Sequence, residues 1–262
     1  MQKISIITVC YNSEDTIEDT LNSVMGLEGI NEFYELEYII VDGKSDDNTL
    51  GIINENKSRI ASKGISISVL SEKDTGIYDA WNKGLKLASG QLIGILSSDD
   101  WYPKNVLINL TGEIKDFSKS FIVTGLREQY TYEKEYMYTR AFKKKIHHNI
   151  KWRMPISFTA TFISREAYNA VGQYNTNYRL SADYEFIYRA IKKKIPFHFL
   201  NKNLVCMRHG GATNNNKNLF TSAYEDYLIR NAMGENVLLS RFIHLKRKAE
   251  IQVILLRNKW FR

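Results

Sequence analysis

The sequence predicts an α/β protein with a mainly parallel central sheet flanked by helices, plus a helical appendage at the C-terminus. Over the first hundred residues, short β-branched runs alternate with segments of helical periodicity, which is typical of a parallel sheet with right-handed crossovers. Polar residues follow each of these runs, so the carboxyl ends of the strands would share a polar edge. Basic and apolar residues with helical spacing fill the last stretch, residues 241–262.

Composition indicates a globular protein, because 44% of the 262 residues are hydrophobic and 25% are charged. The sequence has no apolar run of about 18 residues and no signal-peptide pattern, so a cytoplasmic location is expected. Cys10 and Cys206 lack metal-ligand spacing, which favours buried, reduced thiols. Most of the net charge of +7 lies in residues 241–262, whose seven Lys/Arg and one Glu give +6.

The first four strands are each expected to lead into a helix. Ser13 and Ser45 are candidate caps for the first two helices, the third helix should end at Gly90, and Pro103 suits the first turn of the fourth. The strands are expected at residues 3–10, 36–41, 65–70 and 92–96, and the third helix at 77–88.

Beyond residue 120 the regular alternation stops. Residues 130–142 have the mixed polar and aromatic texture of solvated antiparallel strands. Ser164 is a candidate cap for a helix that ends at Gly172. The other elements are expected as strands at 121–125, 159–163, 196–200 and 204–207, and a helix at 182–193.

The chemistry is expected where the fourth strand ends, at the adjacent carboxylates Asp99 and Asp100. Two such charges repel unless a cation or hydrogen-bond donors offset them, and no cluster of basic residues adjoins them in the sequence. Mn²⁺ or Mg²⁺, itself carrying a diphosphate, fits oxygen ligands of this kind. A solvated turn is the alternative for an isolated pair, but polar residues also end the other three strands.

Two common phosphate-binding patterns are missing. No G-x-G-x-x-G follows the first strand, which argues against a dinucleotide-binding oxidoreductase, and no G-x-x-x-x-G-K-[ST] is present. A bound diphosphate would therefore depend on a metal and on scattered donors.

Four motifs carry a resemblance to a known family. ISIITVCYN, VDGKSDDNT, DTGIYDAWNKG and LSSDDW begin at residues 4, 41, 74 and 96, and in this order they resemble family 2 glycosyltransferases. The third motif is similar to the branch that assembles bacterial surface polysaccharides. The resemblance implies the GT-A (nucleotide-diphospho-sugar transferase) fold over residues 1–215, with a nucleotide-binding half at about 1–102 and an acceptor half at about 103–215. Residues 216–262 would be a basic helical extension.

The resemblance also implies roles for matching positions. Ser98 and Asp99 are expected near the ribose or sugar, and Asp100 on the metal. Thr8, Tyr11 and Asp42 should surround the nucleotide base; Asp74, Asp79 and Lys83 should lie near the base, ribose or donor sugar.

Two later segments are similar to family segments that complete the site. Residues 180–185 resemble the one with the general base, which implies Asp183, with a helix-start charge as the alternative and Glu185 as a rival base. Residues 208–213 resemble a segment that returns to the diphosphate, so His209 is a metal-ligand candidate, with a surface histidine as the equal alternative. Two departures are Lys44, where a small residue is usual, and residues 154–158, which lack a polar pair and put the acceptor contacts in doubt.

The function that the resemblance implies is inverting, metal-dependent transfer from a nucleotide-sugar, most commonly a UDP-sugar, to a hydroxyl of a glycan or polyprenyl-diphosphate-linked acceptor. A sugar nucleotidyltransferase is the first alternative, although the expected Gly-rich basic loop is missing after the first strand. The second is a non-enzymatic, basic nucleic-acid-binding protein, suggested by the tail, and salt-dependent DNA binding would identify it.

The tail predicts an amphipathic helix. Its apolar residues recur at steps of three and four: Phe242, Leu245, Ala249, Val253, Leu256 and Trp260. The cations beside them are Lys246, Arg247, Lys248, Arg257 and Lys259. We expect peripheral contact with the inner face of the cytoplasmic membrane. A helix docked on the catalytic domain is the alternative, and contact with another copy of the chain, as a homo-oligomer, stays open.

Overall fold

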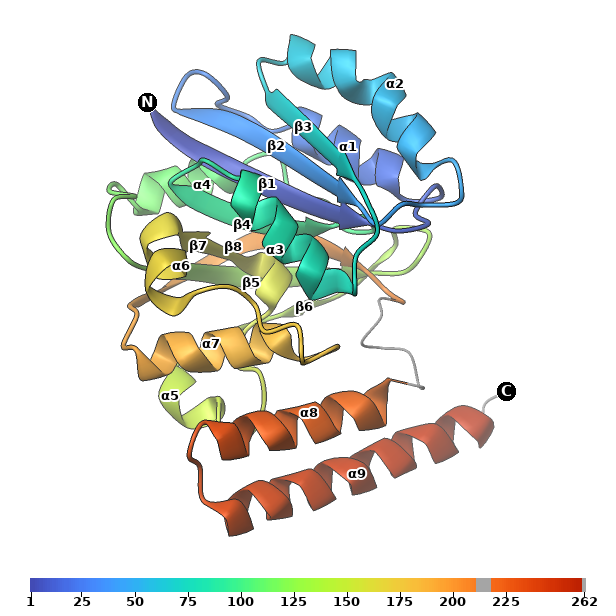
Figure 1. Cartoon of the computed structure of the whole chain (residues 1–262), viewed down its shortest axis with the longest axis vertical. Coiled ribbons are helices and arrows are strands. Elements are labelled where there is room, and N and C mark those ends of the chain that lie inside the picture. Colours follow the sequence, from blue (N-terminus) through green and yellow to red (C-terminus); the bar gives the residue numbers. More distant parts are fainter. Residues whose placement is uncertain (211–217, 261–262) are drawn as a thin grey trace.

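A computed structural model describes residues 1–210 and 218–260. Its centre is one eight-stranded sheet in the order β3-β2-β1-β4-β7-β5-β6, with β8 paired to β5 (Figure 1). The strands are β1 (Gln2–Cys10), β2 (Tyr34–Asp42), β3 (Ser66–Ser71), β4 (Leu92–Ser97), β5 (Ile122–Tyr130), β6 (Tyr136–Arg140), β7 (Thr161–Ser164) and β8 (Phe197–Arg208). The predicted class, an α/β fold with a central sheet flanked by helices, is confirmed.

Strands β1, β2, β3 and β4 pair in parallel, so their carboxyl ends lie at one level. Cys10 pairs with Asp42, Asp42 with Ser71, and Val9 with Ser97, so the residues after each strand emerge along one edge. The alternation of strands with α1 (Ile17–Met25), α2 (Thr49–Ser62) and α3 (Ile77–Leu87) is as predicted. This edge is where an open α/β sheet binds its ligands.

The second half of the sheet is mixed. Strand β7 runs antiparallel between β4 and β5, and the exposed β6 is antiparallel to β5, as the polar and aromatic texture predicts. The strands expected at 196–200 and 204–207 form one strand, β8, parallel to β5. The polar residues between them form an irregularity in the pairing of β8 with β5. Phe199 pairs with Thr124 and Asn203 pairs with Leu126, so β8 has more residues than β5 over this stretch.

Helices cover both faces of the sheet, and each face has its own core. The first core includes α1, α2 and α4 (Val106–Glu113), and the second includes α3, α6 (Arg165–Val171) and α7 (Ala182–Lys192). Ser164 caps α6 as predicted, by accepting from the Ala167 N–H, and Gly172 ends that helix. The remaining short helical turns are α5 (Ile146–Asn149) and η1 (Phe158–Ala160).

Two predicted helix caps are wrong. Helix α1 begins only at Ile17, after a turn in which Ser13 contributes its backbone carbonyl, and α2 begins at Thr49 rather than directly after Ser45. Both serine side chains form hydrogen bonds elsewhere at the strand-end edge: Ser13 with Ser98 at 2.8 Å and Ser45 with Asp42. The longer loops between strand and helix therefore supply this edge with hydroxyl groups.

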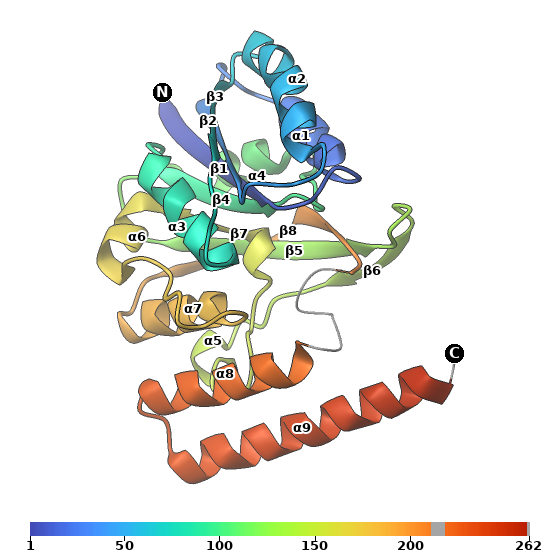
Figure 2. The same cartoon turned by 45° about the vertical axis from the view of Figure 1, so that its right-hand side comes forward.

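The C-terminal residues form two helices, α8 (Leu219–Ala232) and α9 (Val237–Trp260), below the rest of the molecule in Figure 1. Helix α8 lies between α7 and α9, and α9 runs past the start of α8 (Figures 1 and 2). The helical character of this extension is as predicted, while the boundary at residues 215–216 stays a prediction. Within the described part of the chain, no helix combines the length and the apolar content that a bilayer crossing needs.

Candidate active site

Side-chain hydrogen bonds join the loops after β1 and β2. The Asn12 N–H donates to the Ser45 hydroxyl at 3.0 Å, and the Asp46 N–H donates to the Asn12 side chain at 2.9 Å. Asn12 and Lys44 both have left-handed backbone conformations, with φ of 49° and 66°. This conformation accounts for a small residue usually standing at position 44, because a side chain there is strained by about 1–2 kcal/mol.

Asp42, at the end of β2, is buried and internally satisfied. Oδ1 accepts from the Ser45 hydroxyl and, at 3.2 Å, from the Ser45 N–H, while Oδ2 accepts from the Ser71 hydroxyl at 2.6 Å. The carboxylate therefore ties the ends of β2 and β3 to the loop after β2. A nucleotide base could form a hydrogen bond with the Asp42 carboxylate only by replacing one of these bonds.

Gly43 leaves a narrow space between Tyr11 and Asp74. A Cβ at position 43 would lie 2.7 Å from Asp74 Oδ2 and 3.4 Å from the Tyr11 ring. Tyr11 is 58% exposed, so its ring is free on its other side for a planar ligand. The Asp74 carboxylate, the Gly43 backbone and the Tyr11 ring therefore lie side by side at the strand-end edge, and this group is called here the slot.

The loop after β3 is held by a local charge network. Lys83 Nζ lies 3.0 Å from Glu72 and 3.5 Å from Asp79, and it donates to the Lys73 carbonyl. Burial lowers the pKa of Lys83, but the hydrogen bond to Glu72 and the charge of Asp79 outweigh it and hold the pKa above its usual value. Asp79 also accepts from the Thr75 N–H at 3.0 Å, so Asp79 and Lys83 are brought together, while Asp74 accepts separately from the Gly76 N–H at 2.9 Å.

Thr8 is not at this edge. It is fully buried in β1, and its hydroxyl accepts a hydrogen bond from Tyr38 at 3.1 Å. The strand continues for two further residues before the chain turns, so Thr8 lies within the core beneath the expected base site. Its place is that of a packing residue, in contrast to the predicted contact with the base.

Asp99 and Asp100 differ in their surroundings. Asp100 is 1% exposed; Oδ1 accepts from the Arg208 N–H at 3.0 Å, and Oδ2 is buried without a partner among the described residues. Burial, then the charge of Asp99, raises the pKa of Asp100 well above its usual value. Asp99 is partly exposed, and burial raises its pKa while Arg208 counteracts the shift.

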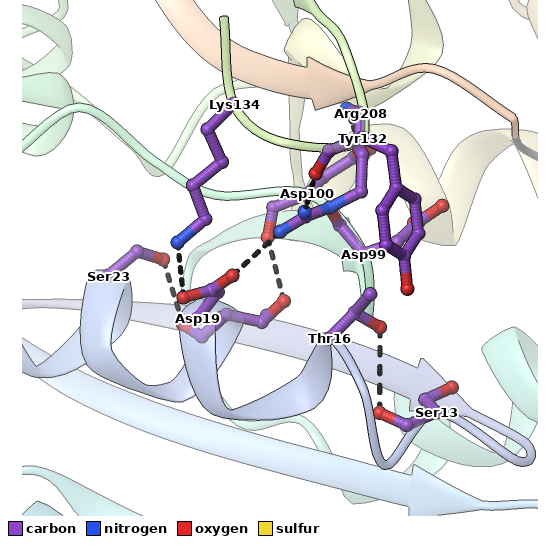
Figure 3. A network of polar contacts seen from close by, with 10 residues as sticks. Ser13, Thr16, Asp19, Ser23, Asp99, Asp100, Tyr132, Lys134 and Arg208 are labelled. Atoms are coloured by element: carbon purple, nitrogen blue, oxygen red, sulfur yellow. Dashed lines mark hydrogen bonds and ion pairs between the residues drawn. The ribbon is translucent and has the colours of Figure 1, made fainter.

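Arg208, at the end of β8, brings one basic residue next to this pair, although no cluster of basic residues adjoins the pair in the sequence. Its buried guanidinium donates to the Asp99 carbonyl at 3.2 Å and to Asp19 at 2.7 Å, and it also contacts the Tyr132 carbonyl. Lys134 reaches Asp19 from the same loop as Tyr132, so two cations converge on this one carboxylate (Figure 3). The Arg208 guanidinium makes none of its hydrogen bonds to the side chains of Asp99 or Asp100.

The partnerless Oδ2 of Asp100 is suited to be a ligand of a cation. A buried carboxylate oxygen without a donor is unfavourable unless a cation or proton compensates it. The described residues contain no cluster of three or more His, Cys, Asp or Glu side chains able to hold a metal. His209 is exposed, and its backbone N–H donates to the Tyr130 carbonyl. Gly211 to Thr213, the end of the predicted diphosphate segment, lie outside the described residues.

Asp183 lies in the first turn of α7, beside the aromatic residues of α3. Its Oδ1 accepts from the Tyr78 hydroxyl at 3.0 Å and from the Tyr184 N–H at 2.8 Å. Both of these bonds go to Oδ1. Burial raises the pKa of Asp183, and a raised pKa brings an aspartate closer to the range of an effective general base.

Trp81 belongs to the aromatic cluster beside Asp183, called here the base pocket. Its ring stacks on Phe158 at 5.1 Å and meets Tyr78 edge-on at 5.0 Å, as expected for a packing and site-wall aromatic. Its buried Nε1 has no hydrogen-bond partner among the described residues. The rival base Glu185 is buried and paired with Arg189 at 2.7 Å, so its charge is already compensated.

Helix α8 contributes residues that the sequence patterns did not indicate. Glu225 accepts the N–H groups of Arg179 at 2.8 Å and Leu180 at 2.9 Å, and so fixes the chain just before α7. Burial raises the pKa of Asp226 to about 6, with the Asp183 charge adding to the shift. The C-terminal extension is therefore part of the support of the candidate base.

Relatives in sequence match only part of their own length. The chain is 33% identical over 125 residues to a poly-beta-1,6-N-acetyl-D-glucosamine synthase of Staphylococcus epidermidis, which covers 48% of this chain and 28% of the relative. It is 29% identical over 153 residues to a PGL/p-HBAD biosynthesis glycosyltransferase of Mycobacterium bovis (58% and 57%). It is 33% identical over 138 residues to a UDP-Glc:alpha-D-GlcNAc-diphosphoundecaprenol beta-1,3-glucosyltransferase of Escherichia coli (48% and 51%).

Solved structures share the fold at low identity. S. aureus TarS 1-349 in complex with UDP-GlcNAc has a TM-score of 0.65 and 19% identity, over 94% of this chain and 72% of that one. The mannosyltransferase PcManGT of Pyrobaculum calidifontis, in complex with GDP-Man and Mn2+, has a TM-score of 0.66 and 15% identity, over 95% and 69%. The model of the family described as "Glycosyl transferase family 2" matches residues 5–193, well over half of the chain. The protein therefore belongs to glycosyl transferase family 2.

Proposed function

We propose that the protein transfers a sugar from a nucleotide-sugar to a hydroxyl of a glycan or a lipid-linked acceptor in surface-polysaccharide synthesis. One observation carries the proposal: adjacent residues in the first turn of α3 serve two separate carboxylate sites. Tyr78 holds Asp183 in its aromatic pocket, and Asp79 belongs to the charge network of the strand-end edge. A donor bound along that edge would thus have a base close to its reacting end.

Asp183 is the general base of this proposal. As the acceptor oxygen forms a bond to the anomeric carbon, the bond from that carbon to the diphosphate oxygen breaks, and the hydroxyl proton passes to Asp183 Oδ2. One displacement of this kind inverts the anomeric configuration. The Tyr78 hydroxyl keeps its proton, because burial and then the Asp183 charge raise its pKa well above the usual value, and it orients the carboxylate as a donor.

The donor proposal is a UDP-sugar, held in the slot of Tyr11, Gly43 and Asp74. Solved structures with this fold have been described with UDP-GlcNAc and with GDP-Man and Mn2+, so the fold accommodates such donors. We propose Asp100 as the residue that would hold a divalent cation, with Asp99 beside it. The cation would supply charge compensation for the departing diphosphate.

The acceptor proposal follows the relatives. One relative's name includes a diphosphoundecaprenol-linked sugar and another's a polymer of N-acetylglucosamine, so a glycan or a polyprenyl-diphosphate-linked sugar is the class that we propose. A lipid-linked acceptor would be met at a membrane surface, for which residues 241–262 are the predicted contact.

A panel of UDP-, GDP- and dTDP-sugars tests the proposal. We expect saturable binding of a UDP-sugar by calorimetry and slow release of the free nucleoside diphosphate when water replaces the acceptor. A nucleotidyltransferase, the first alternative, would instead release pyrophosphate from a nucleoside triphosphate and a sugar phosphate. Pyrophosphate release, or no binding of any nucleotide-sugar, would contradict the proposed reaction.

A further inference from the structure

One side of α9 exposes a continuous row of apolar residues. Leu238, Phe242, Leu245, Val253 and Leu256 are 77%, 58%, 56%, 56% and 58% exposed, and Ala249 between them is exposed too. Their steps of three and four residues place them on one face, called here the α9 stripe. The residues that dock α9 on the protein are others, since Ser240, Ile243 and Ile251 are buried.

The stripe faces away from the molecule. Helix α9 is the outermost element, with α8 on its inner side in both views (Figures 1 and 2). The described side chains of the stripe, which end before residue 257, therefore do not dock on the protein. Helix α9 itself is docked through its other side, where the His244 ring lies 3.1 Å from the Ala223 carbonyl. Soluble monomers seldom expose so large a contiguous apolar patch without a partner.

Cations flank the stripe on both sides. At 3.6 residues per turn, Lys246 lies on one side of the row, and Arg241 and Lys248 lie on the other; all three are exposed. Glu250 is the one acidic residue in the sequence of α9; it lies on the same side of the row as Lys246, and its charge is compensated by Arg247 at 3.2 Å and Arg153 at 3.9 Å. The surface that α9 presents is therefore apolar at its centre and cationic at both margins.

We propose that α9 lies along the surface of an anionic phospholipid bilayer, with the α9 stripe among the acyl chains and the flanking cations at the headgroups. Long basic side chains beside an apolar row can reach the headgroup level while the row is buried. Charge decides against a second copy of the chain, because two such faces would bring Lys246, Arg241 and Lys248 against like charges. The inference adds a surface to the proposed function, and vesicle binding tests it without any sugar transfer.

The test is co-sedimentation of the full-length protein with phosphatidylcholine vesicles, with and without phosphatidylglycerol. We expect binding only to the anionic vesicles and a loss of about tenfold or more in Phe242→Gln/Leu245→Gln, because about two large apolar side chains no longer leave water. Lys246→Glu/Lys248→Glu should weaken binding similarly, and added salt should weaken what remains. The matched control is Ile254→Gln: Ile254 is 42% exposed but follows buried Ile243 by eleven residues, about three turns, on the inner side.

The binding of a UDP-sugar and the thermal midpoint, measured on every variant, show whether the fold is retained. Vesicle binding that is equal in the wild type and the stripe variants would overturn the inference, as would a dimer that the stripe variants convert to a monomer. Duplex-DNA binding that depends on Lys246 and Lys248 but not on the stripe would also overturn it. Lipid binding without sugar transfer would support this inference and contradict the proposed function.

Discussion

The two ends of the candidate site are built differently. The donor edge is assembled from loops that follow successive parallel strands, and its carboxylates either tie loops together, as Asp42 does, or have a free oxygen, as Asp100 does. The base pocket is assembled from helices, and one carboxylate, Asp183, lies among aromatic rings. The difference lies in the neighbours of each carboxylate: serine hydroxyl groups donate to Asp42 at the donor edge, whereas the hydroxyl of a buried aromatic residue, Tyr78, donates to Asp183. Burial raises the pKa at both ends, at Asp100 and at Asp183.

A metal requirement is the largest effect expected, and it tests the donor edge alone. We expect chelation with EDTA to reduce transfer to background, Mn²⁺ or Mg²⁺ to restore it, and Asp100→Asn to abolish it, because the partnerless Oδ2 is the proposed ligand. Transfer rates measured with and without each ion check this. Full turnover in excess EDTA would show that Arg208 and other donors suffice.

The base pocket is tested next by Asp183→Asn. Losing a general base should reduce kcat by ~10²–10⁴-fold while donor binding, measured by calorimetry, stays unchanged. Its pH profile is a second measurement: the base must be unprotonated, so activity should fall as the pH drops through a pKa above that of an ordinary aspartate. A variant Asp183→Asn with normal turnover, together with an inactive Glu185→Gln, would assign the base to Glu185.

Gly43→Ala should give a smaller effect, again confined to the donor edge. The added Cβ, 2.7 Å from Asp74 Oδ2, would push that carboxylate out of the slot, so we expect the donor KM to rise by roughly tenfold, or about 1.4 kcal/mol, with little change in kcat. Gly112→Ala is the matched control, since no atom lies within 4 Å of a Cβ there. An unchanged donor KM for Gly43→Ala would show that the nucleotide base binds elsewhere.

The donor edge could be predicted from the sequence because its carboxylates Asp42, Asp74 and Asp99 lie at the end of a strand or within three residues after it. Asp42, Asp74 and Asp99 needed only the strand ends and the parallel order to be placed on one edge. Hydrogen-bond partners within that edge could not be predicted: Ser13 and Ser45 look like helix caps in sequence, and only the longer loops turn their hydroxyls to Ser98 and Asp42.

The support of the site depends on contacts between distant parts of the chain, and these leave no local pattern. Arg208 binds Asp19, which precedes it by 189 residues, and Glu225 binds the Arg179 and Leu180 N–H groups from a helix outside every recognised motif. In the sequence, Glu225 cannot be distinguished from an exposed acidic residue on the surface of a helix. Tertiary packing alone makes these residues partners.

The smallest effect expected, and the sharpest test of the comparison, is Glu225→Gln. The carboxylate accepts two N–H groups, and an amide offers one oxygen, so one N–H would lose its partner and stability should fall by about 1–3 kcal/mol. Because Leu180 lies three residues before Asp183, a shift of this segment should also reduce kcat a few-fold with an unchanged donor KM.

Glu235→Gln is the control for this variant, since Glu235 also ties the extension to the body, through the Tyr188 hydroxyl at 2.6 Å and Lys151 at 3.0 Å, but far along α7 from the base. It should lower the thermal midpoint without lowering kcat. Equal losses of kcat in both variants would mean that α8 stabilises the fold in general. A loss of kcat in Glu225→Gln alone would show that an element outside the four recognised motifs positions Asp183.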